Sequence, residues 1–94
     1  MKIFEFLNTI RQDQELKEII MNSPEVFGSY KPRNYPGRRI KGTPAKIATD
    51  YFWGSINGAK FRCLCEEKYG SWRGDKDAVF LFIQEARQNA GIDN

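Results

Sequence analysis

Six positively charged residues, and no negatively charged one, lie between Glu25 and Asp50. The arginine guanidinium presents a planar fork of donors that matches phosphate oxygens, and lysine adds a compact charge. Two tyrosines are interleaved with these cations, and a tyrosine ring can stack on an unpaired base or a sugar face. This combination favours an anionic ligand. The expected binding residues are Tyr30, Lys31, Arg33, Tyr35, Arg38, Arg39, Lys41 and Lys46.

The charge of the chain is unevenly divided. Fifteen basic and twelve acidic residues give the 94-residue chain a net charge of +3. All of the acids lie outside the cationic stretch, so that stretch carries +6 and the remainder carries −3. A protein with its charge divided in this way is expected to bind an acidic partner.

Two functions from different classes fit such a partner. The first hypothesis is a non-enzymatic nucleic-acid-binding protein, in which a basic, tyrosine-containing loop contacts DNA or RNA phosphates. The second is a small adaptor or inhibitor that docks on an acidic or nucleic-acid-binding face of a larger protein complex. Two plainer alternatives also stay open. The cations can serve only solubility, or they can pair with the protein's own acids, such as Asp13, Glu15 and Glu18.

Aromatic residues outside the cationic stretch supply candidate interface anchors. Residues 51–53 are all aromatic, and three consecutive helical positions span about 200° of the helix, so at least one ring should be exposed. A second tryptophan lies in the short glycine-bounded stretch 70–74. Exposed tryptophan and arginine side chains often dominate protein interfaces. The candidate anchors are Trp53, Trp72 and Arg73.

Catalytic and metal-binding chemistry finds little support in the composition. The chain has no histidine, which is the usual general base near neutral pH and a common metal ligand. Cys63 and Cys65 are two residues apart, too close in sequence for an unstrained disulfide, and are expected to be reduced thiols. We therefore expect no enzyme activity, no metal and no cofactor.

The spacing of apolar residues predicts helices at both ends of the chain. Residues 2–21 form an amphipathic pattern, with Asp13 as an alternative cap that would divide it into two helices. Ser23-Pro24 suits the start of one further turn. Near the C-terminus, Asp75 is expected to cap a helix over about 75–90, with Arg87 among the outward-facing residues.

Between these helices lie a basic loop, residues 28–43, and a central element, residues 44–69. The loop holds two prolines and three glycines, which favour extended and turn structure. Thr43-Pro44 is typical of a helix start, predicting a helix over 44–53. Beyond it two interpretations compete. Either a turn at 54–58 leads to a helix over 59–68, or Asn57-Gly58 forms the turn of a β-hairpin over 51–65.

The expected architecture is one domain, residues 1–94: a mainly α, small helical bundle with the basic loop on its surface. The alternative is an α+β fold with the 51–65 hairpin between the terminal helices. No run approaches the about 20 apolar residues that span a bilayer, and the N-terminus lacks a signal-peptide pattern, so a cytoplasmic location without membrane contact is expected. The oligomeric state stays open. The expected aromatic core is Phe4, Phe6, Phe52, Trp53, Phe61, Phe80 and Phe82.

Overall fold

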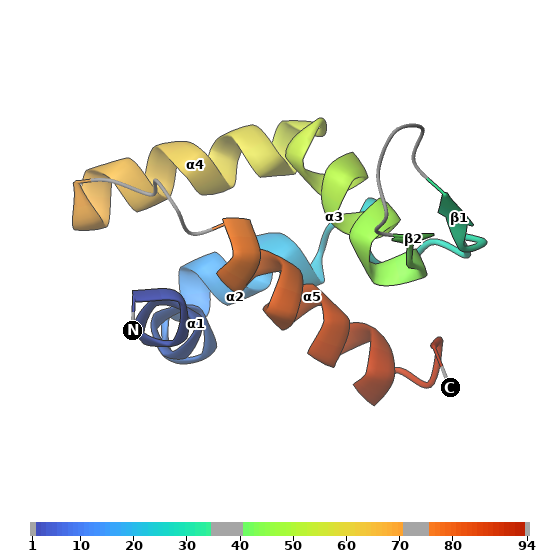
Figure 1. Cartoon of the computed structure of the whole chain (residues 1–94). Helices are drawn as coiled ribbons and strands as arrows, with labels where there is room; N and C mark the ends of the chain where they lie inside the picture. The colour runs from blue at the N-terminus through green and yellow to red at the C-terminus, as the bar shows by residue number, and fades with distance from the viewer. Residues whose placement is uncertain (1, 35–40, 71–75, 94) are drawn as a thin grey trace.

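A computed structural model describes residues 2–34, 41–70 and 76–93 and confirms the mainly α architecture (Figure 1). In these ranges α2 packs on α4, and α5 packs on both α1 and α3. The elements are α1 (Lys2–Gln12), α2 (Gln14–Met21), the 3₁₀ helix η1 (Pro24–Phe27), β1 (Arg33–Asn34), β2 (Lys41–Gly42), α3 (Pro44–Trp53), α4 (Ile56–Tyr69) and α5 (Lys76–Asn89). None of the described helices has the length and apolar character that a bilayer crossing requires.

The N-terminal helix is divided at Asp13, as the alternative interpretation predicted. The Asp13 carboxylate accepts hydrogen bonds from the backbone N–H groups of Glu15, at 3.1 Å, and Leu16, at 3.3 Å. These donors have no partner within their own helix, so the side chain caps α2. The single helix predicted over residues 2–21 is therefore two helices.

Residues 51–65 are helical except for a turn at Gly54-Ser55, and the hairpin alternative is wrong. The chain turns at Gly54-Ser55, where the Ser55 hydroxyl accepts a hydrogen bond from the Gly58 N–H at 3.1 Å and so caps α4. Helix α4 thus begins at Ile56, three residues before the predicted start. Gly58 lies inside the first turn because α4 crosses α3 closely there. A Cβ atom at this position would collide with the backbone oxygen of Phe52.

The core is aromatic and aliphatic, with one clear departure from expectation. Phe6, Phe52, Phe61 and Phe82 are buried, whereas Trp53 and Phe80 are half-buried. Phe4 is 58% exposed and does not belong to the core. It precedes Phe6 by two residues, which places it about 200° around the helix from that buried ring.

Candidate functional site

Two short segments of the basic loop, β1 and β2, form an antiparallel pairing. In this pairing Arg33 lies opposite Gly42, and Asn34 lies opposite Lys41. The backbone of Lys41 is therefore brought beside that of Asn34, and α3 begins three residues after Lys41, with Thr43 as its N-cap. Of the predicted site residues, Tyr35, Arg38, Arg39, Trp72 and Arg73 lie outside the described residues.

Two of the predicted cations have described side chains near the loop. Lys31 is exposed. Lys46, in the first turn of α3, is half-buried, with its Nζ 3.8 Å from an Asp50 carboxylate oxygen and 6.0 Å from the centre of the Phe80 ring. An ion pair this exposed contributes little energy, so Lys46 remains a charge that an anionic ligand can use.

Tyr30 belongs to the base of the loop. Its hydroxyl donates a hydrogen bond to the backbone oxygen of Glu25 at 2.8 Å, and its ring stacks on that of Tyr51 with centroids 5.3 Å apart. The guanidinium of Arg87 lies 5.5 Å from the centre of the Tyr30 ring. Burial raises the pKa of the Tyr30 hydroxyl, against the opposing effect of the Arg87 charge. The hydroxyl is therefore a neutral donor at physiological pH.

The prediction that Arg87 faces outward is wrong. Its side chain is 1% exposed, and its guanidinium binds both carboxylate oxygens of Asp93, at 2.7 and 3.0 Å. The same group donates to the backbone oxygens of Val26, at 2.7 Å, and Gly28, at 2.8 Å. One buried cation therefore joins α5, the C-terminal residues and the chain where the basic loop begins. Arg87, Tyr30 and Asp93 together are called the loop anchor below.

A sequence signal for Arg87 did exist. Val79, Ile83 and Ala86 form the buried stripe of α5, and Arg87 follows Ile83 by four residues. Positions four apart share one helix face, so the spacing alone places this arginine on the core side. Arg87 was predicted to face outward because its side chain is charged. A buried charge is tolerated when it is paired and hydrogen-bonded, as the contacts of Arg87 show.

The protein's acids proposed as internal partners of the loop are engaged elsewhere. The Nζ of Lys68 lies 3.1 Å from an Asp13 oxygen and 2.6 Å from a Glu15 oxygen. Glu18 accepts a hydrogen bond from Gln14 at 2.9 Å. Within the described ranges, none of these three acids is paired with a cation of the basic loop.

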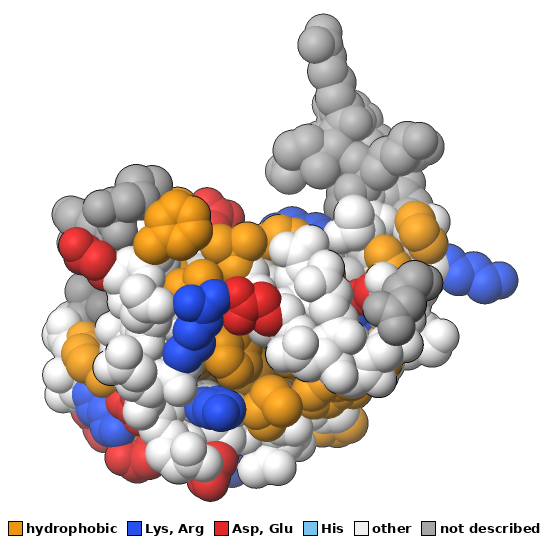
Figure 2. Space-filling view, turned by 90° about the horizontal axis from the view of Figure 1, so that it is seen from below, with side chains coloured by type: hydrophobic (Ala, Val, Ile, Leu, Met, Phe, Trp, Pro, Cys, Tyr) orange, Lys and Arg blue, Asp and Glu red, His pale blue; other side chains and the backbone are white. Residues whose placement is uncertain are grey.

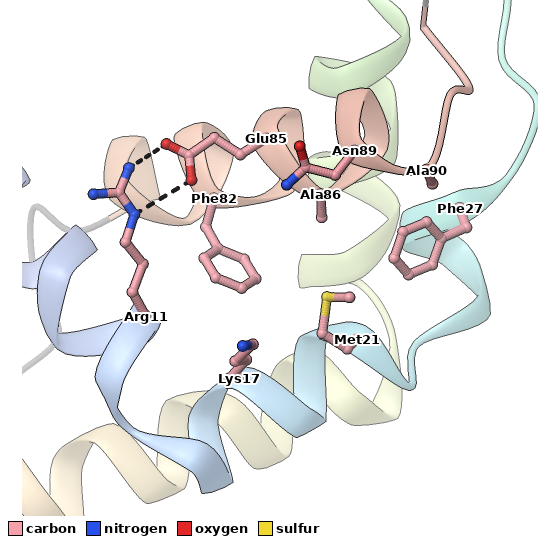
Figure 3. A pocket seen from close by; sticks show the side chains of 9 residues that line it. All are labelled: Arg11, Lys17, Met21, Phe27, Phe82, Glu85, Ala86, Asn89 and Ala90. Carbon is pink, nitrogen blue, oxygen red and sulfur yellow. Dashed lines mark hydrogen bonds and ion pairs between the residues drawn. The ribbon is translucent and has the colours of Figure 1, made fainter.

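A second surface feature is a groove between α2, η1 and α5. This groove has a volume of about 550 Å³ and an apolar floor. At one end the Arg11 guanidinium pairs with both carboxylate oxygens of Glu85, while Lys17 lies on the rim with no ion pair in the described residues (Figure 3). Seen from below, hydrophobic side chains gather beside a few charged ones on this face (Figure 2). The floor consists of Met21, Phe27, Phe82, Ala86 and Ala90.

The described residues hold no cluster of histidine, cysteine, aspartate or glutamate side chains suited to a metal ion. Cys63 is exposed, Cys65 is buried, and both are free thiols. Comparison with family models, curated proteins and solved structures gives no match to this chain. Function is therefore inferred from the chain's own residues.

Proposed function

We propose that this protein is a non-enzymatic nucleic-acid-binding protein whose basic loop contacts phosphates. The observation that carries the proposal concerns the stretch between Glu25 and Asp50, which has six positively charged residues and no negatively charged one. The rest of the protein holds this stretch at defined points. Within it β1 pairs with β2, and the buried Arg87 binds the backbone oxygens of Val26 and Gly28 at its start. A loop held in place loses less conformational freedom on binding than a free basic tail does.

The charge count sets the expected salt dependence. If about four of the six cations meet duplex phosphates, the slope of log affinity against log salt is about −3.6. The affinity then falls roughly 150-fold between about 50 and 200 mM salt. Lys31, Arg33, Arg38, Arg39, Lys41 and Lys46 are the proposed phosphate contacts, with Tyr35 available for stacking on a base or sugar.

The test is a fluorescence anisotropy titration of labelled single- and double-stranded DNA and RNA at both salt concentrations. The double variant Arg38→Glu/Arg39→Glu should lose binding while keeping its helical circular dichroism. The double variant Lys17→Glu/Lys76→Glu changes the net charge equally but lies outside the basic stretch, and should retain most of the affinity. Equal losses in the two variants would mean that overall charge, rather than the loop, determines binding.

The groove beside the anchor favours a second candidate, an adaptor or inhibitor that docks on a larger protein. Its apolar floor and the rim cation Lys17 suit an apolar segment that carries a carboxylate. Met21 is 41% exposed, so Met21→Glu should preserve the fold while blocking such a segment. A partner retained at about 200 mM salt by the wild type and lost by this variant would support docking. A partner retained by both would exclude the groove.

A further inference from the structure

Tyr51 is a large aromatic residue that stays exposed next to the start of the basic loop. It is 50% exposed, whereas Phe52 is buried and Trp53 is half-buried. The three consecutive aromatic residues were expected to leave at least one ring at the surface, and Tyr51 is such a ring. It is not among the binding residues or interface anchors that the sequence predicted.

One face of the Tyr51 ring is covered by Tyr30. The two ring planes differ by 28° and their centroids are 5.3 Å apart, which is a stacked arrangement. Because Tyr51 is nevertheless half exposed, its open surface includes the ring face turned away from Tyr30. A ring that is supported on one face and open on the other can receive a further flat ring.

The supporting ring of Tyr30 is itself held in place. Its hydroxyl donates a hydrogen bond to the backbone oxygen of Glu25 at 2.8 Å, and the Arg87 guanidinium lies 5.5 Å from its centre. The tip of the ring also lies against the backbone of Gly28, where an added Cβ atom would collide with it. The stacked pair therefore exists before any ligand binds, so stacking on Tyr51 costs little side-chain entropy.

The stacked pair adjoins the cations of the basic loop. Lys31, which follows Tyr30 in the chain, is exposed. The acid next to Tyr51 is Asp50, which points about 100° away around α3. Its carboxylate lies 3.8 Å from the Nζ of Lys46. Proteins that hold single strands use this combination: cations follow the phosphates, and aromatic rings stack on the bases.

Base pairing determines which nucleic acid can use an open ring. In a duplex both faces of each internal base are covered by its neighbours, so a protein ring reaches a base face only after costly unstacking. Bases of a single strand can be splayed out and stacked on an aromatic side chain. We propose that the ligand of this protein is single-stranded nucleic acid, with an unpaired base stacked on Tyr51. This inference rests on the proposed function and narrows its ligand to one class.

The first test compares two strands of equal charge by fluorescence anisotropy. Oligothymidylate of about 12 nucleotides and an abasic strand of the same length carry the same phosphates, but only the first has bases. The wild type should bind oligothymidylate at least about tenfold more tightly. Tyr51→Ala should lose most of this preference, whereas Tyr51→Phe, which keeps the ring, should retain it. Phe4→Ala removes another exposed ring, on α1, and should behave as the wild type.

The outcomes separate stacking from phosphate contact. A wild type that binds neither strand would contradict the proposed function and the inference together. A wild type that binds both strands equally, or a preference that survives in Tyr51→Ala, would overturn the stacking and leave the phosphate contacts standing. Duplex DNA should bind Tyr51→Ala within about twofold of the wild type, because its internal bases do not reach the ring. An equal loss on duplex and single strand would mean that Tyr51 only positions the loop.

Nuclear magnetic resonance gives a direct readout of the stacking. A base on the open face of Tyr51 should move the ring-proton signals of Tyr51 upfield when the protein is saturated with oligoadenylate, because the purine ring current shields them. Tyr69 is the internal reference: it is 47% exposed and ends α4, far from the loop (Figure 1). Its signals should stay in place. Unshifted Tyr51 signals in the saturated complex would contradict the inference.

Discussion

Arg87 is the residue on which the position of the basic loop depends. Its guanidinium satisfies the backbone oxygens of Val26 and Gly28 and both oxygens of Asp93. Removing the side chain would leave these acceptors without their donor, the Val26 oxygen in a buried site and the others in partly buried ones. The cost of such a loss is large because the unpaired groups keep their desolvation penalty.

Arg87→Ala should therefore lower the free energy of unfolding by about 3 to 5 kcal/mol. Arg87→Lys should recover only part of this loss, because an ammonium group cannot reproduce the two-pronged contact with Asp93. Arg11→Ala is the matched control: its ion pair with Glu85 is 43% exposed on each side and should contribute only about 0.5 kcal/mol. Urea denaturation followed by circular dichroism measures all three. Similar losses at Arg11 and Arg87 would contradict the role of burial.

Asp13 gives the fold a dependence on pH. Burial acts to raise the pKa of its carboxyl, but hydrogen bonds from Tyr69 and Lys68 outweigh that effect and hold the pKa below the ordinary aspartate value. The folded state thus binds the proton less tightly than the unfolded state does. The stabilisation is complete above about pH 5 and is lost as the pH falls through about 3.9 and then through the folded pKa.

Asp13→Asn should remove this contribution while keeping the cap, because asparagine caps helices about as well as aspartate. The variant should be less stable than the wild type at pH 7, and the difference should shrink as the pH falls below 4. Urea denaturation between about pH 2 and 7 measures this. Glu5→Gln, at an exposed carboxylate on α1, is the control and should show a smaller change. A difference at Asp13 that is constant with pH would contradict the assignment.

At the scale of elements, local signals predicted helix ends well where a cap decides them. Thr43, whose hydroxyl accepts a hydrogen bond from the Lys46 N–H at 3.2 Å, begins α3 as expected. Gly70, with a φ of 76°, ends α4 in the left-handed conformation that glycine adopts freely. The start of α4 was missed because Gly58 was interpreted as a turn residue. Gly58 instead allows α4 to pack closely on α3. The local sequence does not show that α3 is the helix that lies opposite.

The close crossing of α3 and α4 at Gly58 can be tested with one methyl group. Gly58→Ala should destabilise the fold by about 2 to 3 kcal/mol, because the added Cβ meets the fixed backbone of Phe52. Gly54→Ala is the control: a Cβ there meets nothing closer than 3.7 Å, and its φ of −84° suits alanine. It should change stability by less than about 0.5 kcal/mol. Thermal denaturation measures the stability of the two variants. Equal stabilities would mean that α3 and α4 can move apart to accommodate the added methyl group.

The candidate site also combines local features, which the sequence predicted, with contacts between distant residues, which it did not. The charge pattern of the basic loop is local, so the sequence alone was enough to single it out. The loop anchor and the groove between α2, η1 and α5 depend on residues more than fifty positions apart, such as Val26 and Arg87. No spacing rule within one element predicts contacts of that kind. Arg87 was predicted to face outward although its spacing from Ile83 fits the core side, and only the packing of α5 on η1 shows which groups it binds there.

For the whole molecule, positive and negative charge are divided between separate parts of the chain. The stretch between Glu25 and Asp50 carries +6, and the remainder carries −3. Such a division orients a protein near a polyanion, because the basic part is attracted and the acidic remainder is repelled. Salt weakens both effects, and the steepness of its influence on affinity depends on the number of phosphates that the protein contacts.

The proposed function therefore predicts how the salt dependence changes when loop cations are neutralised. Arg38→Gln/Arg39→Gln removes two of about four phosphate contacts and should reduce the slope of log affinity against log salt from about −3.6 to about −1.8. Lys17→Gln/Lys76→Gln removes the same charge outside the basic stretch and should leave the slope near its wild-type value. Anisotropy titrations with duplex DNA at several salt concentrations measure both slopes. An equal change in the two variants would mean that net charge, rather than contact at the loop, sets the salt dependence.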